Sequence, residues 1–158
     1  MTQRHVGDAE RRARIGIRHR LAPGMQAATI QEAASSVVVL HATDAASVLL
    51  EARARMVEPS VDAMEVAMYE EPTVLRLLAM RRTLFLVPLE DVPIVHAAAS
   101  QAVGEVERRR TLGMLAASAI GPDPEGLMEE LEAIGLAAIR EGGEVATAEL
   151  RRLDPRFG

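Results

Sequence analysis

Two runs of β-forming residues, 73–79 and 83–87, lie between Pro72 and Pro88 in a sequence whose other periodic segments are helical. Apolar runs of this length that are separated only by Met80-Arg81-Arg82 predict a β-hairpin. The turn contains neither Gly nor Asn, so a tight primed turn is not expected. One hairpin among helices restricts the chain to a mainly helical α+β fold.

Helical patterns surround the hairpin on both sides. Apolar residues at every fourth position between Asp8 and Leu21 predict an amphipathic helix. A capping box that begins at Thr29 and closes at Glu32 predicts a second helix over roughly 30–40. Further helices are expected from Thr43 or Asp44 to Met56, from Ser60 to Tyr69, over about 89–113 and 124–141, and as a short segment from Thr147 to Leu153. Several helices followed by a hairpin give the order of a helix-turn-helix fold with a β wing.

The strongest chain-breaking signal is Gly121-Pro122-Asp123-Pro124. We therefore expect a first winged-helix domain over 1–120 and a partial second winged-helix domain over 121–158. The second part contains one long helical pattern, a Gly-Gly break and the beginning of another helix, without a hairpin of its own. We interpret it as the opening of a second, similar unit.

Composition excludes several classes of protein. With 49% hydrophobic and 26% charged residues, the chain can bury a core, which excludes a wholly disordered protein. The absence of Cys excludes a disulfide scaffold and favours a reducing compartment, which we take to be the cytoplasm. No stretch reaches the roughly 20 apolar residues of a spanning helix, so no membrane partner is expected. The histidines lack metal-ligand spacing and no phosphate-binding glycine motif occurs, so neither a metal nor a cofactor is expected.

The basic residues are all Arg, and they are unevenly distributed. Residues 1–20 contain six Arg and two acidic residues, whereas residues 21–158 carry a net charge of −9. Because the guanidinium group suits phosphate, Arg14 and Arg18 are candidate DNA contacts. A solvated helix face is the alternative interpretation of this charge run.

Three segments together resemble a known family. They are L-H-A-T-D-A-A-S-V-L-L-E-A-R-A-R-M, Y-E-E-P-T-V-L-R and M-R-R-T-L-F-L-V-P-L-E-D-V-P, in this order. They resemble the winged-helix DNA-binding superfamily that contains the AlkZ and YcaQ DNA glycosylases, from about Arg12 to Val95 and more weakly to the end. The most specific segment runs from Met80 to Pro88 and is similar to the family's R-G-T-L-H-L-V-P hairpin. The resemblance implies double-stranded DNA as the partner.

The resemblance also implies a catalytic segment. In the characterised glycosylases a Q-x-Q or Q-x-D motif positions the water that attacks the sugar carbon of an alkylated nucleotide. His41, Ala42 and Thr43 match these positions, so His41 and Thr43 become candidate catalytic residues with changed identities. A neutral imidazole can accept a proton from water, and Asp44 can orient the ring or stabilise positive charge on the sugar. In the structural alternative, Thr43 or Asp44 caps the third helix and His41 ends the second.

Three arginines of the hairpin are further candidate DNA contacts. Arg81 and Arg82 lie at the expected tip, where neighbouring positive donors can meet phosphate. Arg76 lies in the first strand, where it either faces the same DNA channel or pairs with Glu70 or Glu71. A solvated turn is the alternative for the two arginines at the tip.

Three functions are open from the sequence. The first is a DNA glycosylase that takes an alkylated base out of the stack and hydrolyses its N-glycosidic bond. The second is a DNA-binding or regulatory module without catalysis. The third is a winged helix that binds protein, which the charge of −9 over residues 21–158 favours because it repels phosphate. The sequence leaves open whether the chain is an enzyme, which lesion it prefers and its oligomeric state.

Overall fold

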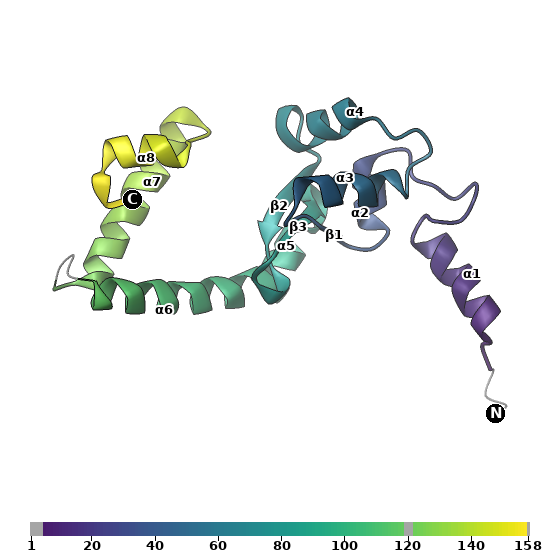
Figure 1. The fold of residues 1–158 in the computed structure, drawn as a ribbon, viewed down its shortest axis with the longest axis horizontal. Helices are drawn as coiled ribbons and strands as arrows, with labels where there is room; N and C mark the ends of the chain where they lie inside the picture. The colour runs from purple at the N-terminus through teal and green to yellow at the C-terminus, as the bar shows by residue number, and fades with distance from the viewer. Residues whose placement is uncertain (1–4, 119–121, 158) are drawn as a thin grey trace. The chain divides into compact units, whose positions relative to one another are not determined.

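The computed structural model of the protein describes residues 5–118 and 122–157 (Figure 1). The chain divides into two compact units, Met1–Gly104 and Glu105–Gly158. This division lies inside one helix, α6 (Gln101–Ala117). The assignment of winged-helix domains to 1–120 and 121–158 stays a prediction, and Gly121, where the expected linker begins, lies outside the described residues.

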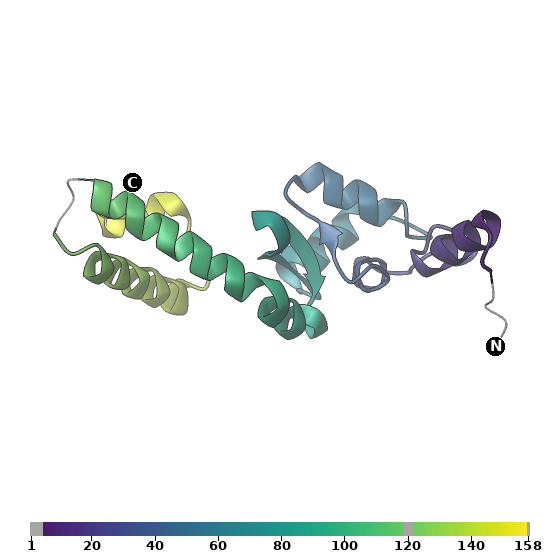
Figure 2. The same ribbon diagram turned by 90° about the horizontal axis from the view of Figure 1, so that it is seen from below.

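The first unit is a mainly helical α+β arrangement (Figures 1 and 2). Before the hairpin its elements are α1 (Asp8–Arg18), α2 (Ile30–Ser35), β1 (Leu40–His41), α3 (Ala45–Arg53), α4 (Val61–Glu65) and a π-helical turn (Val66–Glu70). The hairpin and the segments after it are β2 (Val74–Leu78), the turn η2 (Met80–Arg82), β3 (Leu84–Pro88), a 3-10 turn (Leu89–Asp91), α5 (Val92–Val95), a π-helical turn (His96–Ser100) and α6. The predicted mainly helical α+β class with one hairpin is confirmed.

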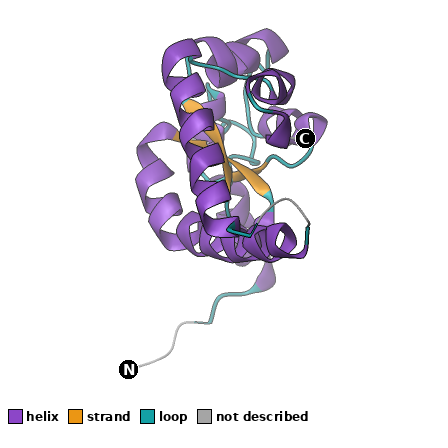
Figure 3. Ribbon diagram, turned by 90° about the vertical axis from the view of Figure 1, so that its left-hand side faces the viewer, coloured by secondary structure: helices purple, strands orange, loops and turns teal. Residues whose placement is uncertain are grey.

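The three strands form one antiparallel sheet in the order β1-β3-β2 (Figure 3, orange). β2 and β3 are the two arms of the predicted hairpin, and β1 adds a short strand at the other edge of β3. The hairpin follows helices, and the segment between α2 and α3 adds a third strand to it. This arrangement is a winged-helix-like fold. The cross-strand pairs include Val74 with Pro88, Arg76 with Leu86, Leu77 with Phe85, Leu78 with Leu84, Leu40 with Leu86 and His41 with Phe85.

Each face of the sheet contributes to a separate core, because side chains alternate along a strand. On one face, Leu40 and Leu86 belong to a cluster that also contains buried residues of α2, α3 and α4. On the other face, Phe85 and Val87 pack with Val95 of α5. The hairpin is therefore held by helices on both faces.

The second helix is shorter than the sequence pattern predicts. The sequence pattern predicts a helix over 30–40, but α2 ends at Ser35. The three valines at 37–39 are stiff at χ1 and favour extended structure, and Leu40 is buried where β1 pairs with β3. The interpretation of His41 as the end of this helix is therefore wrong, since His41 lies in a strand.

Side chains cap the helices at predicted positions. Thr29, Asp44 and Ser60 accept backbone N–H groups at the starts of α2, α3 and α4. The predicted caps at Thr29 and Ser60 are confirmed. Of the two candidate caps for the third helix, Asp44 is the one that caps it, and Thr43 has a different partner described below.

The hairpin turn is tight, which the sequence did not lead us to expect. Arg81 and Arg82 have φ angles of +56° and +60°, and Thr83 N–H donates to the Met80 carbonyl over 3.2 Å. Two consecutive left-handed residues closed by such a bond are features of primed turns, which usually contain Gly or Asn. The expectation of no tight primed turn is wrong, because the pairing of β2 with β3 and the fully buried Ala79 hold the two arginines in this conformation.

The second unit is built from helices over the part of it that the structure describes, 105–118 and 122–157. Besides the end of α6, it contains α7 (Pro124–Gly142), α8 (Thr147–Leu153) and a 3-10 turn (Pro155–Phe157). Arg108 of α6 forms an ion pair with Glu132 of α7. None of its described side chains is buried, so this unit has no core comparable to that of the first. None of the described helices in either unit combines the length and the apolar character that crossing a bilayer requires.

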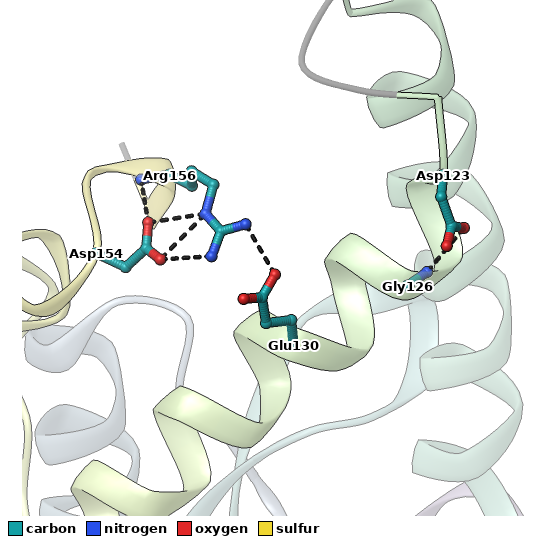
Figure 4. A network of polar contacts seen from close by, with 5 residues as sticks. All are labelled: Asp123, Gly126, Glu130, Asp154 and Arg156. Atoms are coloured by element: carbon teal, nitrogen blue, oxygen red, sulfur yellow. Dashed lines mark hydrogen bonds and ion pairs between the residues drawn. The ribbon is translucent and has the colours of Figure 1, made fainter.

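A polar network attaches the last turn of the described chain to α7 (Figure 4). Arg156 donates to Asp154 over 2.6 Å and to Glu130 over 2.8 Å. These hydrogen bonds lower the pKa of both carboxyl groups and raise the pKa of Arg156. At the other end of α7, Asp123 accepts the Gly126 N–H over 3.0 Å and caps the helix.

Candidate active site

His41 lies at the exposed edge strand of the sheet, in contact with Phe85 of β3. The two rings meet edge to face, with centroids 5.5 Å apart and an interplanar angle of 89°. The Nε2 atom of His41 lies 3.4 Å from Oγ1 of Thr43. Residues two apart on an extended chain project from the same face. The structure thus brings together the two predicted catalytic residues His41 and Thr43.

Thr43 joins this pair to the hairpin. Its Oγ1 atom accepts the N–H of Leu84 over 3.2 Å, and the N–H of Ala42 donates to the Leu84 carbonyl over 2.8 Å. These bonds continue the pairing of β1 with β3 beyond His41. A hydroxyl that accepts one N–H keeps its hydrogen and a second lone pair for other partners. Thr43 can therefore interact with His41 or with a ligand while it remains bound to β3.

Asp44 follows the pair in sequence, but its carboxylate is engaged at the start of α3. Oδ2 accepts the N–H of Ser47 over 2.9 Å and its hydroxyl over 2.8 Å. The Ser47 hydroxyl is the main cause of the lowered pKa of Asp44, and the backbone bonds add to it. Asp44 is consequently ionised at neutral pH. Its position corresponds to the capping alternative, and its role in catalysis stays a prediction.

Arg76 supports the segment between His41 and Thr43. The strand register places Arg76 on the opposite face of the sheet from His41. Its Nη2 atom donates to the carbonyl of the fully buried Ala42 over 2.8 Å, whereas its Nε atom is buried without a hydrogen-bond partner. Within 5–118 and 122–157 the guanidinium has no carboxylate partner, so the ion pair with an acidic residue at 70–71 is not formed.

The other predicted DNA contacts lie in two places. Arg81 and Arg82 are exposed at the tip of the hairpin. Arg14 of α1 forms an ion pair with Glu10 over 2.6 Å, as expected for a solvated helix face, and Arg18 lies in the last turn of the same helix. No residue of α1 is buried. Contact of these arginines with DNA stays a prediction.

Sequence reasoning missed two residues of the site. Phe85 packs against the His41 ring, and Leu84 binds the Thr43 hydroxyl through its backbone. Both belong to the hairpin motif, which the sequence did reveal. Their relation to His41 depends on β1 pairing with β3, for which two residues of strand provide no local pattern.

The site combines an imidazole and a hydroxyl, and the next residue in the chain carries a carboxylate. These are groups that can hold a water molecule, take its proton and offer negative charge to a developing cation. The structure shows no cluster of three or more His, Cys, Asp or Glu side chains suited to a metal ion among the residues it describes.

Comparison with protein families places most of the chain in a known family. Residues 34–156 match the family described as "DNA glycosylase AlkZ-like". The matched range includes β1, the hairpin and α7, whereas α1 precedes it. Neither the curated proteins nor the solved structures yielded a match to the chain.

Proposed function

The chain belongs to the AlkZ-like DNA glycosylase family, and from this premise we propose that it hydrolyses the N-glycosidic bond of an alkylated base in double-stranded DNA. The family match supports the substrate class. The observation that supports the chemistry is the His41–Thr43 pair, with Nε2 and Oγ1 3.4 Å apart and Thr43 bound to β3. A winged-helix mode of duplex binding and action in the cytoplasm are parts of the same proposal.

In the proposed reaction, a water molecule attacks the C1′ carbon of the sugar. The bond from C1′ to the base nitrogen breaks, its electron pair leaves with the base, and positive charge develops on the sugar. His41 accepts the proton that the water loses. An alkylated base that carries positive charge departs as a neutral molecule, so electrons and charge balance.

One tautomer of the imidazole combines the hydrogen bond to Thr43 with the proposed role of His41. When Nε2 carries the proton and donates it to Thr43 Oγ1, the Nδ1 atom of His41 has the free lone pair that accepts the proton from water. The Leu84 N–H holds the Thr43 hydroxyl, and Phe85 holds the ring edge to face. Thr43 therefore acts as the orienting residue for His41.

Asp44 contributes negative charge in this proposal. Its pKa is lowered by Ser47, so the carboxylate is ionised at neutral pH. A fixed negative charge near the sugar stabilises the cation that develops as the bond breaks. The capping bonds from Ser47 both reach Oδ2, which is compatible with this second role.

Duplex binding is proposed to depend on exposed arginines. Arg81 and Arg82 at the hairpin tip are positioned to contact phosphates, and Arg14 and Arg18 of α1 add a second basic surface. Arg76 has no carboxylate partner among the described residues and supports the site from the other face of the sheet.

The test is release of free base from methylated duplex DNA. We expect His41→Ala to lower the rate of release by about 10²-fold or more, because a general base typically contributes that factor. Thr43→Ala should lower it less, and the exposed His96 serves as a matched control whose replacement by Ala leaves release unchanged. All three variants should bind the duplex as wild type does. Release that survives His41→Ala would remove this residue from the mechanism.

A second candidate function is duplex binding without catalysis. Two of the proposed site residues have structural roles that favour this function. Thr43 binds the Leu84 N–H, and Asp44 caps α3. The same experiment separates the two functions. Tight duplex binding without base release from any alkylated substrate would establish the non-catalytic function.

A further inference from the structure

The tip of the β2–β3 hairpin presents apolar side chains to solvent. Met80 begins the turn and is 39% exposed, and Leu78 at the end of β2 is exposed to the same extent. Arg81 and Arg82 follow directly and complete the turn. Turns at a solvated surface are usually built from Gly, Pro, Asn, Asp or Ser, whereas this turn places an apolar residue beside two cations.

The backbone of Met80 is fixed from both sides. Its carbonyl accepts the N–H of Thr83 over 3.2 Å and the Thr83 hydroxyl over 3.0 Å. On the other side, Ala79 is fully buried, and its carbonyl accepts the Arg82 N–H over 3.1 Å. Met80 is therefore a flexible apolar side chain on a rigid support.

This tip is close to the candidate active site along the hairpin. Leu84 donates its N–H to Thr43 and pairs with Leu78, which lies two residues before Met80. Met80 is thus in the turn that begins two residues beyond the Leu78–Leu84 pair, next to the strand that holds Thr43.

We propose that Met80 inserts into the base stack of the duplex and occupies the space of the base that is turned out toward His41 and Thr43. This inference rests on the proposed function, because it describes how the same site reaches its substrate. Apolar side chains that enter a base step unstack it and kink the duplex. A base must leave the stack before an enzyme can act on it.

Arg81 and Arg82 would bind phosphates beside the inserted Met80. A wedge that enters the stack approaches the phosphates on both sides of the opened step, and guanidinium groups can bind them. The two arginines follow Met80 directly in the chain and form the left-handed part of the turn. Strained backbone of this kind is characteristic of sites at which function requires one geometry.

The experiment measures base unstacking directly. The full chain is mixed with a methylated duplex that contains 2-aminopurine beside the lesion, because this base fluoresces more strongly when it is unstacked. We expect wild type to raise the fluorescence on binding, and Met80→Ala to lower this rise at least fivefold while the Kd for the duplex changes less than threefold. Met80→Leu, which keeps an apolar side chain, should retain the rise.

A matched control is Met114→Ala, since Met114 is 57% exposed on α6 outside the hairpin. It should behave as wild type in fluorescence, in Kd and in melting temperature. A fluorescence rise that Met80→Ala preserves would overturn the inference. Binding by wild type without any rise would overturn it as well.

The release of free base, measured on the same samples, tests the proposed function separately. A rise that depends on Met80 without base release would support insertion and refute hydrolysis. Base release by wild type that Met80→Ala leaves unchanged, together with an unchanged rise, would refute insertion and support hydrolysis. Absence of duplex binding would refute both.

Discussion

Replacing Arg81 with Asn and Arg82 with Gly would separate two properties of the hairpin turn, its backbone strain and its charge. Both arginines have left-handed φ angles, +56° and +60°. Gly adopts this region without steric cost, and Asn enters it more readily than Arg. The family's R-G-T-L-H-L-V-P hairpin motif also has Gly where this chain has Arg82.

The expected gain in stability follows from these two angles. A left-handed conformation costs an L-residue about 1–2 kcal/mol. A new Gly offsets part of this gain, because its greater entropy stabilises the unfolded chain by about 0.5–1 kcal/mol. For Arg81→Asn/Arg82→Gly the net increase in the free energy of unfolding is about 1–2 kcal/mol. In a chain of 158 residues this corresponds to a rise in melting temperature of about 4 °C.

Thermal and urea denaturation, followed by circular dichroism, would measure the change in stability. Duplex affinity is measured at several salt concentrations for the same protein. If each arginine neutralises one phosphate, the slope of log affinity against log salt should decrease in magnitude by about 1.8.

Two matched variants complete the design. Arg81→Ala/Arg82→Ala removes the charge but keeps the strain. Its salt slope should therefore decrease as in the Asn-Gly variant, while its melting temperature should not rise. Arg81→Lys/Arg82→Lys keeps both charge and strain. A melting temperature of the Asn-Gly variant at or below that of wild type would refute the strain argument, and an unchanged salt slope would refute the phosphate contacts.

Three further predictions concern the segments around the site. Val38 is a β-branched residue with φ +74° and is 56% exposed, so Val38→Gly should raise the free energy of unfolding by about 1 kcal/mol, whereas Val38→Ala should not. Ser47→Ala should destabilise the protein at neutral pH because the pKa of Asp44 is lowered when folded. This contribution to stability is fully present above the ordinary pKa of 3.8 and is lost as the pH falls through the lowered pKa. The free energies of unfolding of wild type and variant should therefore converge in acid. A difference that stays constant with pH would contradict this linkage. Arg76→Met should cost about 1–3 kcal/mol in urea denaturation, since the buried carbonyl of Ala42 loses its donor, and it should also slow base release.

Features that depend on residues close together in the chain were predictable from local patterns. The caps at Thr29 and Ser60 were predictable because each side chain binds a backbone N–H three residues later. The hairpin was predictable because its two arms follow each other directly between Pro72 and Pro88. The sequence also identified the segment His41 to Asp44 and the tip arginines as candidate functional groups, through a motif that is read residue by residue.

The way in which these parts meet depends on pairing between segments that are far apart in the chain. His41 became a strand residue because β1 pairs with β3, more than 40 residues later, and the gain from burying Leu40 there outweighs the helical pattern before it. The same pairing placed Thr43 on the Leu84 N–H and left Asp44 to cap α3. In each case the local conformations differ little in free energy. Burial and backbone hydrogen bonds to distant residues then select among them, and the sequence pattern near the site does not contain those partners.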